Sequence, residues 1–305
     1  MVIALRRSFP ATPREWRNFL LGVAFASPWI IGFLGFTIYP IGSALYYSFT
    51  RYDLVRDPVW IGVQNYVAFA DDPDFNLVVG NTFWWVLISS PLGVLSAFLM
   101  ALLLNSRIVL RSFFRSIFFF PAIVPVVVTA FVWIFLLNVQ YGAINSTLQA
   151  MGFKTIPFIS SPDLIKWSLV VIHMWSQGAA MVIFLATLQD VPKSLYEAAT
   201  VDGANALRRM WNITVPMVSP IILFNMVMSF ISGFQYFTLP WIMTEGGPSR
   251  SAEFYAIYLY RNAFRWFRMG KASALAWVLF VLILLFTYLI FRTSGRLVYY
   301  AGATR

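Results

Sequence analysis

The sequence predicts an all-α, polytopic membrane protein with six transmembrane helices. Of its 305 residues, 60% are hydrophobic and only 11% are charged, against about half and about a quarter in soluble domains. So few charges cannot cover a surface that faces water, so most of the chain must face lipid or other apolar helices. The chain has no cysteine and one histidine, which excludes disulfide scaffolds and the common metal sites. We therefore expect no metal site and no catalytic residue.

Six windows without a charged residue define the expected membrane spans. They cover residues 18–50, 75–106, 116–153, 167–189, 210–244 and 272–291. Each is at least 20 residues long, and about 20 residues at 1.5 Å rise cross a hydrocarbon core of about 30 Å. Their runs are apolar all round, whereas membrane strands of about ten residues would alternate. We expect helices near 19–41, 81–104, 116–137, 167–188, 217–241 and 272–292.

The basic residues favour cytoplasmic termini. With both termini inside, more than half of the Lys and Arg residues lie in the cytoplasmic segments, as the positive-inside rule requires. The segment 242–271 opposes this orientation, because it places five basic residues outside: Arg250, Arg261, Arg265, Arg268 and Lys271. Its aromatic residues suggest a helix that lies at the membrane interface, with arginines reaching to headgroups.

The same windows give the expected organisation of the chain. A basic cytoplasmic segment (1–17) precedes the first helix and an outer loop (18–76). A transmembrane domain (77–292) follows, and a cytoplasmic tail (293–305) ends the chain. We expect the first helix to be uncleaved, because its charge-free run is longer than the about 7–15 residues of a signal h-region.

The longest cytoplasmic loop, residues 189–216, predicts a rigid elbow. Pro192 suits the first turn of a helix, where its missing N–H costs nothing. Gly203 is placed to end that helix in a left-handed cap, and Asn205 can cap a second short helix. Two short helices joined by a glycine, lying parallel to the membrane, would form a knob for a groove on another protein.

Six positions in this loop also have a fixed spacing, which reads Glu197-Ala198-Ala199, Gly203, Ile213 and Pro216. The pattern resembles the cytoplasmic loop of the permease subunits of binding-protein-dependent ABC importers, in which E-A-A, three residues, G and nine residues precede I-x-L-P. The one departure is Val215 in place of leucine, and Asp202 supplies the acid often found before the glycine. The resemblance implies a type I ABC importer transmembrane domain. It assigns ATPase coupling to Glu197, Ala198, Ala199, Asp202, Gly203, Ile213 and Pro216.

Likeness to the carbohydrate-uptake group of these permeases extends from about residue 18 to 292. It rests on Gly246-Gly247-Pro248 after the fifth helix, on the run from Gly270 to Ala274, and on Ser27-Pro28 and Tyr39-Pro40 in the first helix. The implied solute is a sugar, expected to be a di- or oligosaccharide. Glycerol 3-phosphate and polyols stay open as alternatives, and a stand-alone secondary transporter is a further one.

The resemblance also implies the partners and the location. They are a second permease, expected to be a different chain, two ATP-binding subunits and an extracytoplasmic solute-binding protein, in the inner membrane of a bacterial or archaeal cell; no nucleic acid is expected. The chain's Gly270-Lys271 pair is no P-loop, because Ala272 follows it and Arg265 replaces the upstream glycine. We therefore expect no cofactor on this chain, with ATP and Mg²⁺ used by the partner ATPase.

Polar residues at membrane depth predict a solute path. They are His173 and Gln177 in the fourth helix and Ser229, Ser232, Gln235 and Tyr236 in the fifth. Polar groups inside lipid are costly and tend to be functional, and sugars bind through hydrogen bonds and aromatic stacking. The i, i+3 and i+7 spacing places Ser229, Ser232 and Tyr236 on one helix face. The same residue types also bridge membrane helices as packing groups, and that alternative stays open.

Overall fold

The computed structural model describes residues 12–106 and 108–294. Most of the basic segment 1–17 and of the tail 293–305 lies outside the described residues. The first span is one helical run of 36 residues, made of α1 (Pro13–Phe33), the π-helical turn η1 (Leu34–Ile38) and α2 (Tyr39–Ser48). A capping box starts it, because Thr12 Oγ1 accepts from the Glu15 N–H and the Glu15 carboxylate accepts from the Thr12 N–H.

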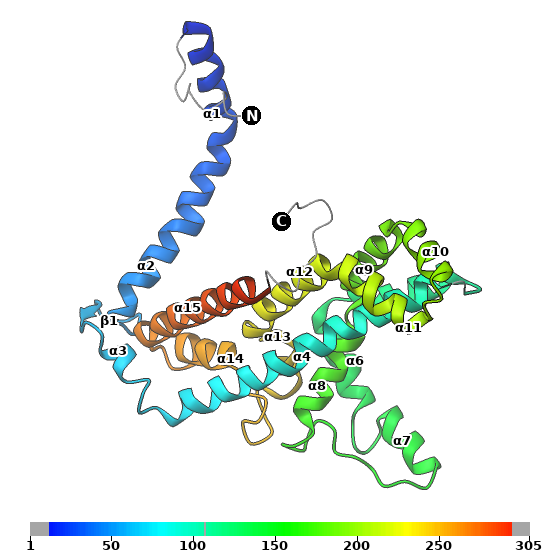
Figure 1. Ribbon diagram of the computed structural model, residues 1–305. Coiled ribbons are helices and arrows are strands. Elements are labelled where there is room, and N and C mark those ends of the chain that lie inside the picture. The colour runs from blue at the N-terminus through cyan, green and yellow to red at the C-terminus, as the bar shows by residue number, and fades with distance from the viewer. Residues whose placement is uncertain (1–11, 107, 295–305) are drawn as a thin grey trace.

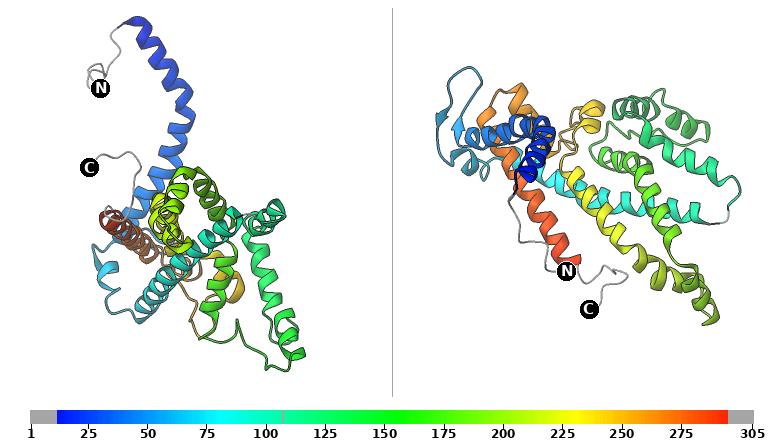
Figure 2. Two further views of the ribbon diagram at one scale, coloured as in Figure 1. Left: turned by 45° about the vertical axis from the view of Figure 1, so that its right-hand side comes forward. Right: turned by 90° about the horizontal axis from the view of Figure 1, so that it is seen from above.

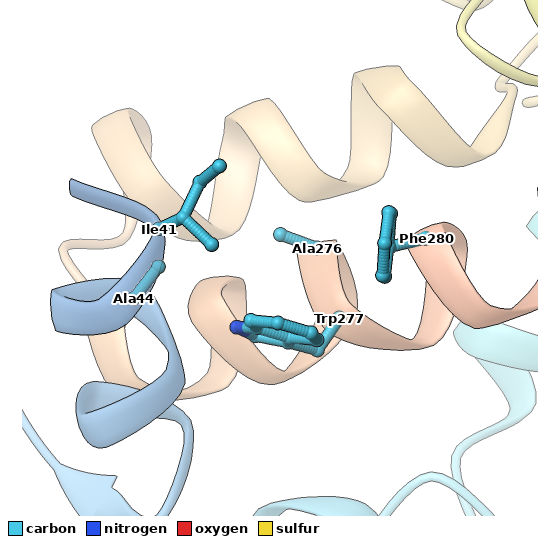
Figure 3. A pocket seen from close by; sticks show the side chains of 5 residues that line it. All are labelled: Ile41, Ala44, Ala276, Trp277 and Phe280. Atoms are coloured by element: carbon cyan, nitrogen blue, oxygen red, sulfur yellow. The ribbon is translucent and has the colours of Figure 1, made fainter. Parts of the chain in front are cut away.

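Among residues 12–106 and 108–294, the first span packs on other helices through its second half. No residue of α1 is buried, and Figures 1 and 2 show α1 standing away from the other helices. α2 packs against the last helix, α15 (Met269–Ser294). A cavity of about 190 Å³ lies between them. Figure 3 shows the side chains that line it, Ile41, Ala44, Ala276, Trp277 and Phe280. This apolar lining does not suit a polyhydroxylated solute.

A short hairpin and a long helix follow. β1 (Thr50–Arg51) pairs antiparallel with β2 (Val59–Trp60), and the one-turn helix α3 (Gln64–Val67) leads to α4 (Pro73–Asn105). Asp72 caps α4 by accepting from the N–H groups of Asp74 and Phe75. α4 packs against α5 (Arg111–Ile123), α8 (Ile165–Trp175), α9 (Gly178–Asp190), α12 (Val215–Phe234) and α14 (Tyr255–Tyr260). It is therefore the central element of the bundle.

The third and fourth spans are bent pairs of helices. α5 (Arg111–Ile123) meets α6 (Val126–Leu136) at 103°, and α8 (Ile165–Trp175) meets α9 (Gly178–Asp190) at 45°. The break after α5 precedes Pro125, which lacks an N–H and cannot continue the hydrogen-bond ladder. The short helix α7 (Ala143–Ala150) lies between the two pairs. Counting each bent pair once, together with the four long helices, gives the six predicted spans.

The last third of the chain differs most from the prediction. α10 (Lys193–Val201) and α11 (Ala206–Arg209) form the elbow, and α11 continues through the π-helical turn η2 (Met210–Thr214) into α12 (Val215–Phe234). The fifth span was expected to reach residue 241, but α12 ends at Phe234 and a separate α13 (Thr238–Thr244) follows. α14 (Tyr255–Tyr260) and η3 (Arg261–Arg265) then lead to α15.

Candidate functional site

The elbow has the local geometry that its sequence predicts. α10 begins directly after Pro192, and Gly203 has a left-handed φ of +72°. The Ala204 N–H donates to Ala199 O at 2.9 Å and the Gly203 N–H to Thr200 O at 3.1 Å, which is the Schellman arrangement of a helix end. Asn205 Oδ1 accepts from the Arg208 N–H at 2.8 Å, so the predicted N-cap of α11 is confirmed.

The tip of the elbow is apolar and exposed. The exposed fractions are 41% for Leu195, 88% for Val201, 67% for Leu207 and 63% for Trp211. The carboxylates of Glu197 and Asp202 are exposed on the same segment. Exposed apolar side chains gathered on one projection are typical of a binding surface.

The elbow is tied to the helix that enters the bundle. The hydroxyls of Tyr196 and Thr214 lie 2.9 Å apart, and Arg209 Nη1 donates to Thr200 Oγ1 at 2.8 Å. From Ala206 to Phe234 the chain is one helical run of 29 residues, roughly 43 Å at 1.5 Å per residue. One continuous helical run therefore joins the elbow to the bundle.

The far end of α12 borders a cavity of about 260 Å³. Three helix breaks surround this cavity, those of α5–α6, α8–α9 and α12–α13. Its lining is uncharged and consists of Pro121, Ala122, Val124, Val126, Thr129, Ile172, His173, Ser176, Tyr236 and Leu239. Two of the predicted path residues, His173 and Tyr236, line it with hydrogen-bonding groups and an aromatic ring.

The two predicted helix-four residues contact each other. Gln177 Nε2 lies 3.0 Å from His173 Nε2 and donates to His173 O at 3.2 Å. A glycine makes room for them, because a Cβ on Gly93 would lie 2.6 Å from His173 Nε2. Gly93 thus allows α8 and α4 to approach closely at the level of the cavity.

Trp85 of α4 is a site residue that the sequence analysis missed. Its ring stacks on Tyr236 at 4.2 Å between centroids with planes 8° apart, and meets His173 edge-to-face at 5.7 Å. Trp85 is fully buried, so it fixes both rings that border the cavity. The one sequence signal was an aromatic pair, Trp84-Trp85, inside a charge-free window.

The three helix-five residues expected on one face do not share it. Because α12 ends at Phe234, Tyr236 turns away from the helical register into the cavity. Ser229 Oγ is buried without a hydrogen-bond partner among residues 12–106 and 108–294, whereas Ser232 and Gln235 are exposed. Ser232 Oγ and Gln235 Nε2 donate to the backbone of their own helix, at Ser229 O and Ile231 O.

The segment 242–271 also departs from its expected interfacial helix. Glu253 is fully buried and pairs with Arg250 and, at 2.6 Å, with Arg261. Arg250 also pairs with Asp74, which raises the pKa of the Arg250 guanidinium further above its usual value. Tyr255 and Tyr258 are buried as well. The carboxylates at the start of α4 and on the segment itself thus pair with Arg250 and Arg261, whereas Arg265 and Arg268 are exposed.

A second ion pair joins the same segment to the cap of α4. Lys271 Nζ and the Tyr258 hydroxyl each donate to Asp72 Oδ2 at 2.7 Å. Burial alone would raise the pKa of Asp72, but these two hydrogen bonds hold the pKa below its usual value of 3.8. The pair therefore contributes stability that is complete above about pH 4 and is lost as the pH falls through the lowered pKa.

Comparison with known proteins supports the family that the spacing in the elbow suggested. Residues 89–298 match the family described as "Binding-protein-dependent transport system inner membrane component". The chain belongs to this family. It is 41% identical to the "Probable ABC transporter permease protein YesP" of Bacillus subtilis over 92% of each chain. It is 32% identical to the "Sulfoquinovosyl glycerol transport system permease protein SmoG" of Agrobacterium fabrum over 86% of each.

The permease fold is also found in a solved structure. A chain of a bacterial alginate ABC transporter, in complex with a periplasmic protein that holds an alginate pentasaccharide, superposes with a TM-score of 0.81. The alignment covers 93% of this chain and 97% of that chain, with 21% sequence identity. The protein is thus a membrane-spanning permease subunit of a binding-protein-dependent ABC transporter, with the fold of an ABC importer permease.

The close approach at Gly93 gives a first prediction. Gly93→Ala should displace the His173 ring and cost about 1–3 kcal/mol of stability through overpacking. Since His173 is the one histidine, ¹⁵N-histidine labelling of this chain yields a single imidazole spectrum, which should shift. Gly80→Ala on the same helix, where a Cβ meets nothing within 4 Å, is the control. An unchanged imidazole spectrum in Gly93→Ala would refute the contact.

The buried carboxylate gives a second prediction. Glu253→Gln leaves two arginines facing a neutral amide, so the free energy of unfolding should fall by about 3–5 kcal/mol. Glu245→Gln is the control, because its pair with Arg265 is exposed and is worth about 0–1 kcal/mol. Thermal unfolding in detergent compares the two, and equal shifts would contradict a structural role for Glu253.

Proposed function

We propose that this permease is the membrane half of an ATP-driven importer and that its elbow, residues 191–211, docks into an ATP-hydrolysing partner. The observation that carries the proposal is the exposed apolar tip on a capped, rigid segment. Leu195, Val201 and Leu207 fit a hydrophobic groove, and Glu197 and Asp202 can pair with basic residues at its rim. ATP and Mg²⁺ are then used by the partner, and this chain is the transport subunit.

The mechanism follows from the helical run that starts in the elbow. Closure of the ATPase subunits on nucleotide displaces α10 and α11. The hydroxyl contact of Tyr196 with Thr214 and the unbroken helix from Ala206 to Phe234 pass this displacement to the break before α13. Tyr236 and the stacked Trp85 move with it, so the wall of the cavity changes when ATP is bound or hydrolysed.

The solute that best fits the cavity is a sugar, expected to be a di- or oligosaccharide. His173, Ser176 and Thr129 offer hydrogen bonds, and the aromatic face of Tyr236 suits a sugar ring. The uncharged lining favours hydroxyl groups over the phosphate of glycerol 3-phosphate, the alternative substrate. Two relatives are named for the transport of sulfoquinovosyl glycerol and of arabinooligosaccharides, which supports a glycoside as the solute. Exposed Ser232 and Gln235 extend a polar surface from the cavity toward a neighbouring subunit.

The isolated first helix supports a second permease. α1 is apolar and unburied, and a Cβ on Gly22, Gly32, Gly35 or Gly42 would meet nothing within 4 Å. Glycine costs a helix about 1 kcal/mol each relative to alanine, and small residues let membrane helices pack closely. We infer that α1 lies against a second, different permease chain. An extracytoplasmic binding protein delivers the sugar, and both termini of this chain are cytoplasmic.

The elbow gives a third prediction. Gly203→Pro breaks the left-handed cap and Glu197→Lys reverses a tip charge, so both should abolish transport and solute-stimulated ATP hydrolysis while membrane insertion persists. Gly152→Pro is a matched control, because Gly152 (φ +82°) ends α7 with the same pair of backbone hydrogen bonds at a site remote from the elbow. Wild-type transport by both elbow variants would refute the coupling role.

The cavity gives a fourth prediction. Tyr236→Ala should weaken the apparent affinity for the transported sugar by roughly tenfold, equivalent to about 1.4 kcal/mol of lost contact, with a smaller loss for His173→Ala. Uptake into proteoliposomes at varied sugar concentration measures this. The control is Thr187→Ala, whose hydroxyl donates to Ile183 O on α9 outside the cavity. Unchanged affinity in both cavity variants would exclude this site.

A further inference from the structure

Five consecutive residues form an exposed tip between η3 and α15. They are Phe264, Arg265, Trp266, Phe267 and Arg268, and all five are exposed. The exposed fractions of the three aromatic side chains are 58%, 43% and 53% in chain order. The residues before the tip, Asn262 and Ala263, are buried, so the chain turns sharply from the core to the surface at this point.

The backbone holds the tip in a strained but fixed shape. Phe267 has a φ of +51°, a region that bulky L-residues rarely occupy and that costs of order 1–3 kcal/mol. The Trp266 N–H donates to Arg261 O at 2.9 Å, and the Arg268 N–H to Asn262 O at 2.8 Å. Strain of this kind persists where the surrounding structure imposes it, so the fold itself holds the tip in its exposed position.

The charges of the tip distinguish it from the rest of its segment. Arg250, Arg261, Arg265 and Lys271 each pair with a carboxylate. Arg268 pairs with no carboxylate in the described part of the chain, and its guanidinium lies over the Trp266 ring at 5.9 Å. An anion from outside the chain can therefore reach Arg268 without displacing an internal partner.

The position of the tip identifies the surface it meets. Residue 269 begins α15, which is long and apolar enough to cross a membrane, so the residues directly before it lie near the depth at which the span leaves the hydrocarbon. Phospholipid headgroups occupy that depth, and Trp, Phe and Arg are the side chains that suit it. Further along the same helix, from Phe280 onward, α15 again exposes apolar side chains such as Val281 and Leu284, as a span that meets lipid does.

We propose that residues 264–268 are an interfacial anchor, in which Phe264 and Phe267 enter the acyl boundary and Arg268 binds phospholipid phosphate. The anchor fixes the depth of α15 in the leaflet. It thereby also fixes the position at which α15 packs against α2. It rests on α15 being a membrane span and not on the proposed elbow or sugar site. It also accounts for an arginine on a side of the membrane where basic residues are disfavoured.

The absence of cysteine from the sequence makes a direct test possible. A spin label is attached to Phe267→Cys or, as a second site, to Phe264→Cys in the whole chain with its co-purifying partners. The assembly is placed in nanodiscs of phosphatidylethanolamine and phosphatidylglycerol. Both labels should collide more often with oxygen, which concentrates in lipid, than with a water-soluble nickel complex. Val55→Cys, 89% exposed in the β1–β2 hairpin, should show the reverse order.

The charge of the anchor is tested in the same preparation. Arg268→Glu should raise the collision rate of the Phe267→Cys label with the nickel complex, because like charges repel the tip from phosphate. Arg56→Glu, an exposed change in the hairpin, should leave it unaltered. A label at both tip sites that meets neither reagent would indicate a protein partner, and one that meets nickel as freely as Val55→Cys would indicate water. Either result overturns the proposal, as does an Arg268→Glu variant without effect.

Discussion

The unbroken helix from Ala206 to Phe234 is the element on which the rest of the permease depends. At one end it is fastened to the elbow by the hydroxyls of Tyr196 and Thr214. At the other end it stops at Phe234, so Tyr236 leaves the helical register and lines the cavity. In the proposed coupling, a break in the middle of this helix would stop a displacement of the elbow from reaching the cavity. Even the π-helical turn at Met210–Thr214 keeps the run continuous.

On the opposite side of the molecule, carboxylates form ion pairs that hold distant segments together. Glu253 lies fully buried between Arg250 and Arg261, and Asp72 holds Lys271 at the start of α15. These pairs account for three of the five basic residues of segment 242–271, namely Arg250, Arg261 and Lys271. They also tie the start of α4 to the start of α15, so two long spans share one electrostatic clamp while the elbow lies beyond their other ends (Figure 1).

The features that the sequence predicts well are those set by near neighbours. Charge-free windows locate the spans, since a desolvated charge is costly wherever it occurs in lipid. The cap at Gly203 and the N-cap at Asn205 depend on hydrogen bonds spanning three to five residues, so the residue types suffice. The spacing from Glu197 to Pro216 led to the family, which the comparisons confirm.

The features that it could not predict depend on contacts between distant segments. Trp85 meets Tyr236, and Gly93 meets His173, only after α4 has packed on α8 and α12. No proline or glycine directly follows Phe234 to signal the end of α12, so nothing in the sequence excluded Tyr236 from the helix. The prediction that Ser229, Ser232 and Tyr236 share one helix face was therefore wrong. The aromatic spacing of segment 242–271 suggested arginines at the headgroups, whereas Arg250 pairs with Asp74, a partner far away in the sequence. Roles in solute transport for the six predicted path residues stay predictions.

The elbow's partner is the central claim, and one measurement tests it most directly. A photoreactive benzophenone on Val201→Cys, the one thiol of this chain, is irradiated in native membranes and the cross-linked protein is identified by mass spectrometry. The account predicts an ATP-hydrolysing subunit, with a yield that changes when nucleotide is added. Cross-linking to an extracytoplasmic protein instead, or labelling of the thiol by an impermeant reagent from outside the cell, would contradict it.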